Sequence, residues 1–410
     1  MEAVAVLHLL NGEQYSGLER MVDHLVAAAP TQGFRLVLAL LKPDRMRQRM
    51  SAKGGEVHEV PMRSRVDLSG TGRITAIATA AGCRLIHSHT VRSALVARRI
   101  RRATGLPWVH HVHSPALHES MRVGMNLASY LAEAVVMRQA DRVLTVSQAL
   151  AGYVHRHYRV PEARITVVHN GVANVEPDAV TDGEPGDHAS FVHAQANAQA
   201  NARANARANA QANAGNEHPF IILTVGLFRA RKGIEHLVRA AGLLRDAGHD
   251  FRLRLAGEFA EPGYEAAVRG LVAQLGLRDR VEFLGFVDRV DDVLQHCDVF
   301  ALPSLKGEGM PMAVLEAMAH ARPVVASDID GAREILDGGA GLLVPPAEAG
   351  ALADAIARLI RAPDLRLRLA RAAQARQRRH YSLQAMSCRL FEGYRSLLTE
   401  CADRPRIRRR

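Results

Sequence analysis

Cysteine is scarce in this sequence. The chain of 410 residues holds four cysteines, Cys83, Cys297, Cys388 and Cys401, and their wide spacing matches no metal or redox motif. This distribution argues against a disulfide framework and against a cysteine-based zinc site. A reducing, cytoplasmic setting is the simpler expectation.

Long apolar runs and aromatic residues are also few. No apolar run reaches the roughly 18 residues that a membrane-spanning helix needs. Aromatic side chains make up only 4% of the sequence, which gives little support for stacking on nucleic-acid bases. The first residues, MEAVAVLHLLNGEQ, lack the basic region and cleavage site of a signal peptide, and we expect them to form a buried strand.

Acidic residues are outnumbered, and the net charge is +11. Basic residues gather in Arg45–Lys53, in Arg98–Arg102, in Arg361–Arg379 and in the final RPRIRRR. One interpretation is solvated helix faces and a frayed tail. Another is attraction to an anionic membrane surface, where each Lys or Arg adds about 1 kcal/mol. No nucleic acid is expected as a partner, because no recognition motif accompanies the clusters.

Short apolar segments alternate with segments of helical periodicity along both halves of the chain. AVAVLHLL, RLVLALL and WVHHVH are typical of buried strands in the first half, as are FIILTVG, FRLRLAG and RPVVAS in the second. Such alternation predicts βαβ units and parallel sheets. We therefore expect an α/β protein with two Rossmann-like, doubly wound domains that face a central cleft, because ligands bind at the carboxyl ends of such strands.

The expected boundaries follow the composition. Residues 1–177 form the first domain, and residues 218–380 form the second. Between them, residues 178–217 contain an Ala-Asn-Ala-Gln/Arg repeat without an apolar stripe, which indicates a linker or surface insertion. Residues 381–400 are expected to form a last helix that crosses back to the first domain, before a basic tail at 401–410.

Two carboxylates mark the most informative segment, EGMPMAVLE. Glu308 lies in a predicted loop and Glu316 lies eight positions later, inside the helix that we expect Pro311 to begin. Free N–H groups at the start of that helix would form an anion site between the two acids. A nucleotide diphosphate sugar combines an anionic centre with flanking hydroxyl groups, and so it fits this arrangement.

This segment, together with AMAHARPVVASDIDGAREIL and GLLVPP, resembles the retaining GT-B glycosyltransferases of family 4 (group 1) over nearly the whole chain. The resemblance implies that the first domain lies on the acceptor side and that the second domain binds the nucleotide sugar. It implies further that Glu316 holds the donor ribose and that Glu308 lies at the donor sugar. It also implies that backbone N–H groups among Gly309, Met310 and Met312 meet sugar hydroxyls or phosphate.

The basic turn VGLFRARKG departs from the family pattern. The family has an arginine and a lysine that grip the diphosphate, but Leu227 stands at the arginine position here. The resemblance assigns the lysine to Lys232 as a catalytic residue, and it leaves Arg229 or Arg231 to replace the arginine. Gly17 lies in the loop before the first helix, where the resemblance implies close approach to the donor.

Histidines lie at the ends of two of the predicted strands. Strand alternation puts His111 and His113 on one face and His110 on the other. The resemblance places His113 against the donor sugar as a catalytic residue, although a structural role is the alternative. We predict no metal site, because no carboxylate accompanies the histidines, and the family uses no metal cofactor. His87 and His89 share a face and could line the acceptor side.

The expected function is that of a hexosyltransferase. It would move a sugar, with retention and without metal, from a nucleotide diphosphate sugar to a hydroxyl acceptor, in bacterial polysaccharide or glycolipid synthesis. The acceptor is either soluble or lipid-linked, and the protein is either free in the cytoplasm or peripheral on the inner membrane face. A sugar-nucleotide epimerase and a non-catalytic nucleotide-sugar-binding module are the alternatives.

Overall fold

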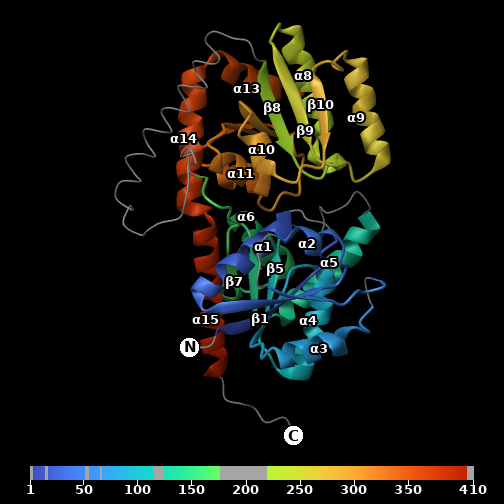
Figure 1. Cartoon of the computed structure of the whole chain (residues 1–410), viewed down its shortest axis with the longest axis vertical. Coiled ribbons are helices and arrows are strands. Elements are labelled where there is room, and N and C mark those ends of the chain that lie inside the picture. Colours follow the sequence, from blue (N-terminus) through green and yellow to red (C-terminus); the bar gives the residue numbers. More distant parts are fainter. Residues whose placement is uncertain are drawn as a thin grey trace, which may run out of the picture.

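Two parallel β-sheets, one in each half of the chain, organise the protein (Figure 1). The computed structural model describes residues 3–13, 17–50, 55–64, 67–114, 123–175 and 219–403. The predicted linker at 178–217 and most of the predicted basic tail lie outside the described residues. The two sheets and their helices form an N-terminal lobe and a C-terminal lobe, drawn below and above in Figure 1.

The N-terminal lobe contains a seven-stranded parallel sheet among the described residues, in the order β3-β2-β1-β4-β5-β6-β7. Its strands are β1 (Val4–Leu10), β2 (Phe34–Leu40), β3 (Glu56–Glu59), β4 (Leu85–Ser88), β5 (Trp108–Val112), β6 (Arg142–Thr145) and β7 (Ile165–Val167). Its helices are α1 (Gly17–Ala28), α2 (Arg45–Arg49), α3 (Thr71–Ala80), α4 (Val91–Thr104), α5 (Val123–Gln139) and α6 (Gln148–Tyr158).

The C-terminal lobe repeats this design with six described strands in the order β10-β9-β8-β11-β12-β13. The strands are β8 (Phe220–Val225), β9 (Phe251–Ala256), β10 (Val281–Gly285), β11 (Val299–Leu302), β12 (Val324–Ser327) and β13 (Leu342–Val344). The helices are α8 (Ile234–Asp246), α9 (Pro262–Gln274), α10 (Val290–Leu294), α11 (Met312–Ala319), α12 (Asp330–Leu336), α13 (Ala349–Arg361) and α14 (Pro363–His380), after which comes α15 (Leu383–Ala402).

Buried strands explain why the sequence folds this way. The central strands carry apolar residues on both faces, and β1 is buried from Ala5 to Leu10, as expected when helices cover both sides of a parallel sheet. The edge strand β3 is different, because its sequence EVHE holds no apolar run and none of its residues is fully buried. This strand is absent from the strands that the sequence predicts, since an edge strand needs little apolar surface.

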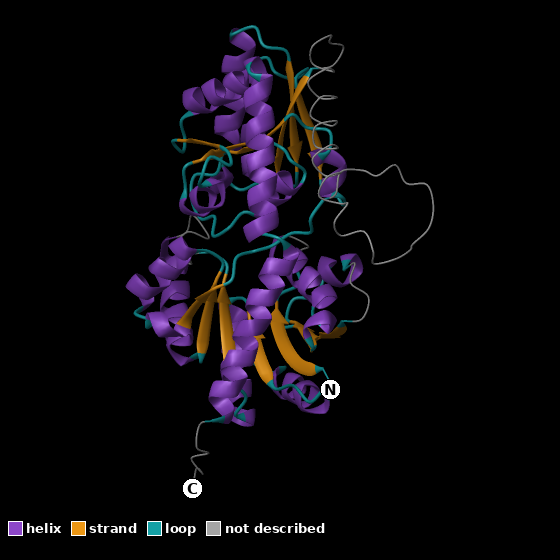
Figure 2. Cartoon of the chain, turned by 90° about the vertical axis from the view of Figure 1, so that its left-hand side faces the viewer, coloured by secondary structure: helices purple, strands orange, loops and turns teal. Residues whose placement is uncertain are grey.

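The chain crosses between the lobes twice, at one place. The first crossing follows β7, and the second is the junction of α14 and α15, the two helices that run along both lobes at the front of Figure 2. The Val172 N–H donates to the Tyr381 carbonyl at 3.0 Å, and the Leu383 N–H donates to the Val172 carbonyl at 2.8 Å. The two crossings are therefore joined by backbone hydrogen bonds.

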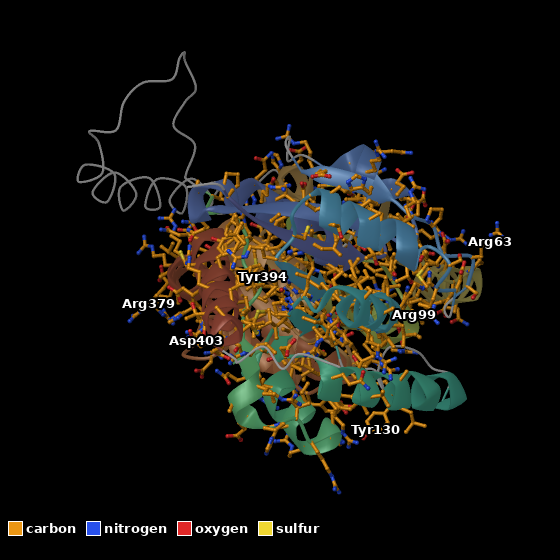
Figure 3. The ribbon with its side chains drawn as sticks, turned by 90° about the horizontal axis from the view of Figure 1, so that it is seen from below. Arg63, Arg99, Tyr130, Arg379, Tyr394 and Asp403 are labelled. Carbon is orange, nitrogen blue, oxygen red and sulfur yellow. The ribbon has the colours of Figure 1, made fainter. Side chains whose placement is uncertain are left out.

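The last helix completes the N-terminal core. α15 packs against α1, and its Phe391 ring stacks on Phe34 with the ring centroids 4.9 Å apart. In the view from below, Tyr394 of α15 lies inside the outline of the molecule, whereas the exposed Arg63 and Arg379 lie at opposite edges (Figure 3). Within the described residues, no helix combines the length and hydrophobicity needed to cross a bilayer.

Candidate active site

The two carboxylates lie on either side of the start of α11. Glu308 is in the loop after β11, and Pro311 is the residue that precedes the first helical turn, so the helix begins one residue later than predicted. Glu316 lies about one turn inside the helix. The N–H groups at this helix start have no partner within the helix, which leaves them available to an anion.

Glu308 is held by three donors from its own lobe. Lys232, at the end of the short helix after β8, pairs with Oε1 of Glu308, and the Ser304 hydroxyl donates to the same oxygen at 2.8 Å. Arg231 lies 3.5 Å from that oxygen. Burial opposes ionisation of Glu308, but Lys232 and Arg231 outweigh it and lower the pKa of this carboxyl. Glu308 is therefore an anion at neutral pH.

The geometry distinguishes the two candidate arginines. Among the described residues, Arg231 and Lys232 are the cations paired with Glu308, and Arg231 also donates to the Gly307 carbonyl at 3.3 Å. Arg229 precedes the short helix and makes no ion pair with Glu308. The structure thus places Arg231, and not Arg229, beside Glu308, the acid that is predicted to lie at the donor sugar.

Glu316 faces the other lobe. Its Oε1 lies 2.7 Å from Nη2 of Arg20 on α1, and its side chain is only 7% exposed. Burial raises the pKa of Glu316, although Arg20 acts in the opposite direction. Burial of this carboxylate is costly, and its ion pair with Arg20 offsets only part of the cost. A ligand that donates hydrogen bonds to Glu316 would therefore be favoured.

The predicted backbone positions meet the N-terminal lobe directly. A Cβ atom on Gly309 would lie 2.0 Å from the carbonyl oxygen of His113, so only glycine allows this approach of the lobes. Gly17 lies against Met312, whose Cγ would be 3.2 Å from a Cβ on the glycine. The Met310 carbonyl accepts a hydrogen bond from Nδ2 of Asn170 at 3.1 Å.

Glu334 links the lobes as well. Its carboxylate caps a helix of the other lobe. The backbone N–H groups of Gln148 and Ala149, at the start of α6, donate to its two oxygens at 2.9 and 3.2 Å. His169 lies 2.8 Å from Oε1. Although burial opposes ionisation, His169 and these N–H groups lower the pKa of Glu334.

A second set of interlobe contacts comes from α2. Arg45 pairs with Glu258 at 2.7 Å, and Arg49 pairs with Asp288 at 2.7 Å while lying 4.0 Å over the Phe286 ring. Glu258 also lines a pocket of about 420 Å³ at the ends of β9 and β10, which Phe259, Arg269 and Phe283 help to form. The side chains in these two ion pairs are 30–76% exposed, so solvent screens them and they contribute little to stability.

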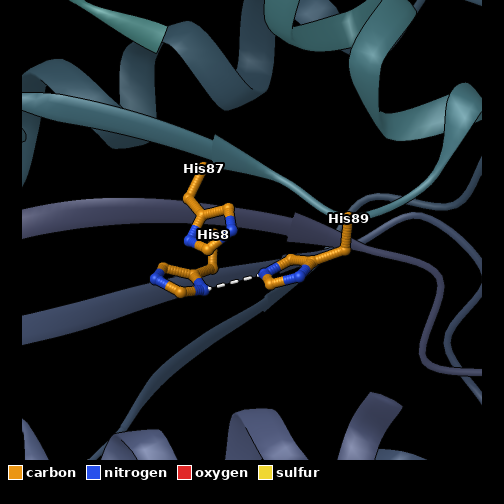
Figure 4. A group of neighbouring side chains, drawn as sticks. All are labelled: His8, His87 and His89. Carbon is orange, nitrogen blue, oxygen red and sulfur yellow. Dashed lines mark hydrogen bonds between the residues drawn. The ribbon is translucent and has the colours of Figure 1, made fainter. Parts of the chain in front are cut away.

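Histidines gather at the carboxyl ends of β1, β4 and β5. Nδ1 of His8 lies 3.1 Å from Nε2 of His89, and Nδ1 of His89 lies 3.1 Å from Nε2 of His113. Figure 4 shows the first of these contacts and the His87 ring beside it. His87 and His89 are almost fully buried, so they do not line an open acceptor surface as the sequence suggests. Burial lowers the pKa of His113 to about 3.

Comparisons with known proteins match both lobes. The family profile "Glycosyltransferase Family 4" matches residues 15–174, and "Glycosyl transferases group 1" matches residues 205–376. The chain belongs to glycosyltransferase family 4. Together the two matches include every residue singled out as a candidate in the sequence.

The family 4 relatives and structures agree with this assignment. The chain is 35% identical to an alpha-D-kanosaminyltransferase of Streptomyces kanamyceticus over 43% of its length, and 28% identical to a D-inositol 3-phosphate glycosyltransferase of Salinispora tropica over 83%. The matches span 46% and 70% of these relatives, and about half the length of the first relatives in general.

A solved structure shows the same fold. HepE from Anabaena, in complex with UDP-glucose, superposes with a TM-score of 0.77 and 21% identity over 96% of this chain and 99% of that one. The present protein therefore has the GT-B fold that the sequence predicts.

Sequence reasoning missed the partners of the two acids. Ser304 lies close to Glu308 in the chain, and a polar residue in that loop was a weak signal. Arg20 is 296 positions from Glu316, and nothing in its local sequence distinguishes it from other helix-surface arginines. The position of Arg20 depends on how the lobes meet, which no single segment encodes.

Proposed function

We propose that this protein transfers a hexosyl group from a nucleotide diphosphate sugar to a hydroxyl acceptor, with retention at the anomeric carbon. The observation that carries this proposal is the convergence of Glu308, Lys232 and Arg231 at the start of α11, next to Glu316. Support also comes from the relatives, which are named as sugar transferases, and from HepE, which was solved with UDP-glucose.

In this proposal the donor lies across the start of α11. Glu316 accepts hydrogen bonds from the ribose hydroxyls, while the free N–H groups near Gly309, Met310 and Met312 meet the diphosphate or sugar hydroxyls. Because Gly17 has no side chain, the opposite wall of the cleft can lie close to the donor. Glu308 holds a sugar hydroxyl, because all three of its described contacts reach Oε1 and leave Oε2 for the ligand.

The transfer step relies on charge. As the bond between the anomeric carbon and the phosphate oxygen breaks, negative charge grows on the diphosphate, and Lys232 and Arg231 stabilise it. The acceptor hydroxyl attacks from the same face and gives its proton to the departing phosphate oxygen. His113 contacts the sugar from the N-terminal lobe. This step requires no metal ion and no protein nucleophile.

A lipid-linked acceptor is part of the proposal. Leu131 and Val135 are exposed one turn apart on α5, and they are 57% and 46% accessible. The adjacent helix α4 presents the exposed Arg99 and Arg102. An apolar strip beside basic residues suits peripheral binding to an anionic bilayer, which is consistent with polysaccharide or glycolipid synthesis at the inner face of the membrane.

A donor screen tests the function. The melting temperature of the full chain is measured with UDP-, GDP- and ADP-sugars, and the stabilising donor is then incubated with alcohol and lipid acceptors. We expect stabilisation by one donor class and a product with the donor's anomeric configuration. Failure of every donor to bind at millimolar concentration would refute the proposal. Inverted products would refute retention, and isomerised donor without acceptor would indicate an epimerase.

A vesicle assay tests the membrane part separately. We expect the protein to sediment with vesicles that contain anionic lipid, and we expect salt to release it. Replacing Leu131 and Val135 with serine should weaken this binding. Equal binding to neutral and anionic vesicles would contradict a role for the basic residues.

A further inference from the structure

Five histidines meet inside the N-terminal lobe, at the edge of the sheet that faces the cleft. They are His8 on β1, His87 and His89 at the end of β4, and His111 and His113 at the end of β5. The ring centroids of His87 and His89 are 4.1 Å apart, and those of His111 and His113 are 4.2 Å apart. This density of imidazole is not explained by the transfer chemistry proposed above, which uses only His113.

A chain of hydrogen bonds connects three of the rings, those of His89, His8 and His87, through Tyr394. If the proton of His89 is on Nε2, it is donated to Nδ1 of His8 at 3.1 Å. The proton of His8 is then on Nε2 and is donated to the Tyr394 hydroxyl at 3.1 Å, and Tyr394 in turn donates to Nδ1 of His87. Each ring in this chain has a consistent tautomer. Nδ1 of His89 is then an acceptor, which faces Nε2 of His113 at 3.1 Å, whereas Nε2 of His87 has no hydrogen-bond partner among the described residues.

The other side of the cluster is not satisfied. His111 is only 1% exposed, and neither of its ring nitrogens has a hydrogen-bond partner among the described residues. A buried polar group without a partner costs roughly 1–3 kcal/mol. A neutral imidazole always offers one lone pair, and the lone pair of His111 lies near those of His89 and His113.

We propose that His89, His111 and His113 bind one Zn²⁺ ion. Nδ1 of His89 and Nε2 of His113 are 3.1 Å apart. Two nitrogens on a tetrahedral zinc, each at about 2.0–2.1 Å, are about 3.3 Å apart. The ligand atoms of all three rings lie within 4.8 Å of one another, so the rings must approach one another by up to about 1.5 Å to complete the set.

The surroundings suit a zinc ion with an open position. Three neutral histidines leave the fourth coordination position to water. His113 is partly exposed where β5 ends at the cleft, which provides a path for the ion and its water. The chain from His89 through His8 to Tyr394 is the outer hydrogen-bonded layer that fixes the tautomer of a metal-bound histidine. The sequence predicts no metal here, because no carboxylate accompanies the histidines in the neighbouring sequence.

Metal titration of the full chain tests the proposal. The protein is stripped with a chelator, dialysed, and titrated with Zn²⁺ by calorimetry and with Co²⁺ by visible absorption. We expect one ion per chain and the absorption bands of four-coordinate Co²⁺. His111→Phe, which removes both ring nitrogens at similar volume, should weaken Zn²⁺ binding at least tenfold.

The matched control is His110→Phe. His110 is equally buried in the same strand, but its side chain points to the opposite face, where Nδ1 contacts the Ser88 hydroxyl at 2.9 Å. This variant should bind Zn²⁺ like the wild type. The proposal is overturned if the wild type binds no stoichiometric ion, or if the two variants lose affinity equally.

Spectroscopy on the wild type removes the dependence on a variant that could fail to fold. X-ray absorption of the zinc-loaded protein should show three imidazole ligands and an oxygen. Fewer than three imidazoles, or a sulfur ligand, would overturn the assignment. None of these measurements depends on glycosyl transfer, so the zinc site can fail while the proposed function stands, and the reverse also holds.

Discussion

Replacing Glu316 with glutamine separates ligand binding from folding. Glutamine keeps the shape of the side chain and removes its charge. Because Glu316 is buried and its pKa is raised, the folded protein holds this carboxylate at a cost, and the variant should melt at the same temperature as the wild type or higher. The partner Arg20 is 25% exposed, so water can solvate it after the change.

The same substitution should weaken donor binding. A hydrogen bond to a charged group contributes roughly 1.5–3 kcal/mol. Arg20 already occupies Oε1 of Glu316 at 2.7 Å, which favours the lower end of that range for the ribose. A loss of about 1.5 kcal/mol corresponds to a donor Kd that is roughly tenfold weaker. Titration calorimetry with the donor found in the screen measures this change.

The control is Glu162→Gln, because the side chain of Glu162 is 83% exposed. It should change neither the donor Kd nor the melting temperature. An unchanged donor Kd in Glu316→Gln would refute the assignment of Glu316 to the ribose. A melting temperature that falls together with affinity would show that the residue is structural.

Three further predictions concern the cleft. Lys232→Ala should lower kcat roughly 100- to 1,000-fold with little change in donor Kd, because the lysine acts mainly on charge that develops in the transition state; a change confined to KM would contradict this. Gly309→Ala should lower kcat/KM roughly 100-fold by pushing the His113 carbonyl away, whereas Gly270→Ala, with no neighbour within 4 Å of its new Cβ, should be silent in the same kinetic assay. Glu334→Gln should cost about 1 kcal/mol of unfolding free energy at pH 7 in urea titrations. Since the pKa of Glu334 is lowered from 4.5, its charge stabilises the fold above that value, and this stabilisation is lost as the pH falls below it. The unfolding free energies of the variant and the wild type should therefore converge in acid. A difference that stays constant with pH would exclude a role for the charge.

The fold was accessible from the sequence because its signals are local. The run from Ala5 to Leu10 is apolar without interruption, and such a run is typical of a strand buried on both faces. Strand β3 was missed because it lacks such an apolar run. Its sequence EVHE lies at the edge of the sheet, where a strand needs little apolar surface. Glycine and proline near Glu308 located the start of α11 to within one residue.

The candidate site was only partly accessible. Glu308 and Lys232 could be named from their own motifs, but their direct pairing joins residues 76 positions apart. The choice between Arg229 and Arg231 needed the geometry of the short helix, because both flank the same basic turn. The histidine cluster was beyond reach, since His8, His89 and His113 come together only through the order of strands in the sheet.

The placement of α15 has a consequence for biosynthesis. Tyr394 closes the core of a lobe that begins with β1, and it contacts His8 across 386 positions of sequence. During vectorial synthesis the N-terminal lobe therefore emerges from the ribosome without part of its interior. His8 and Phe34 thus stay uncovered until the segment that forms α15 has been made. A nascent chain that stops short of Leu383 should consequently engage chaperones more strongly than one that ends after Ala402.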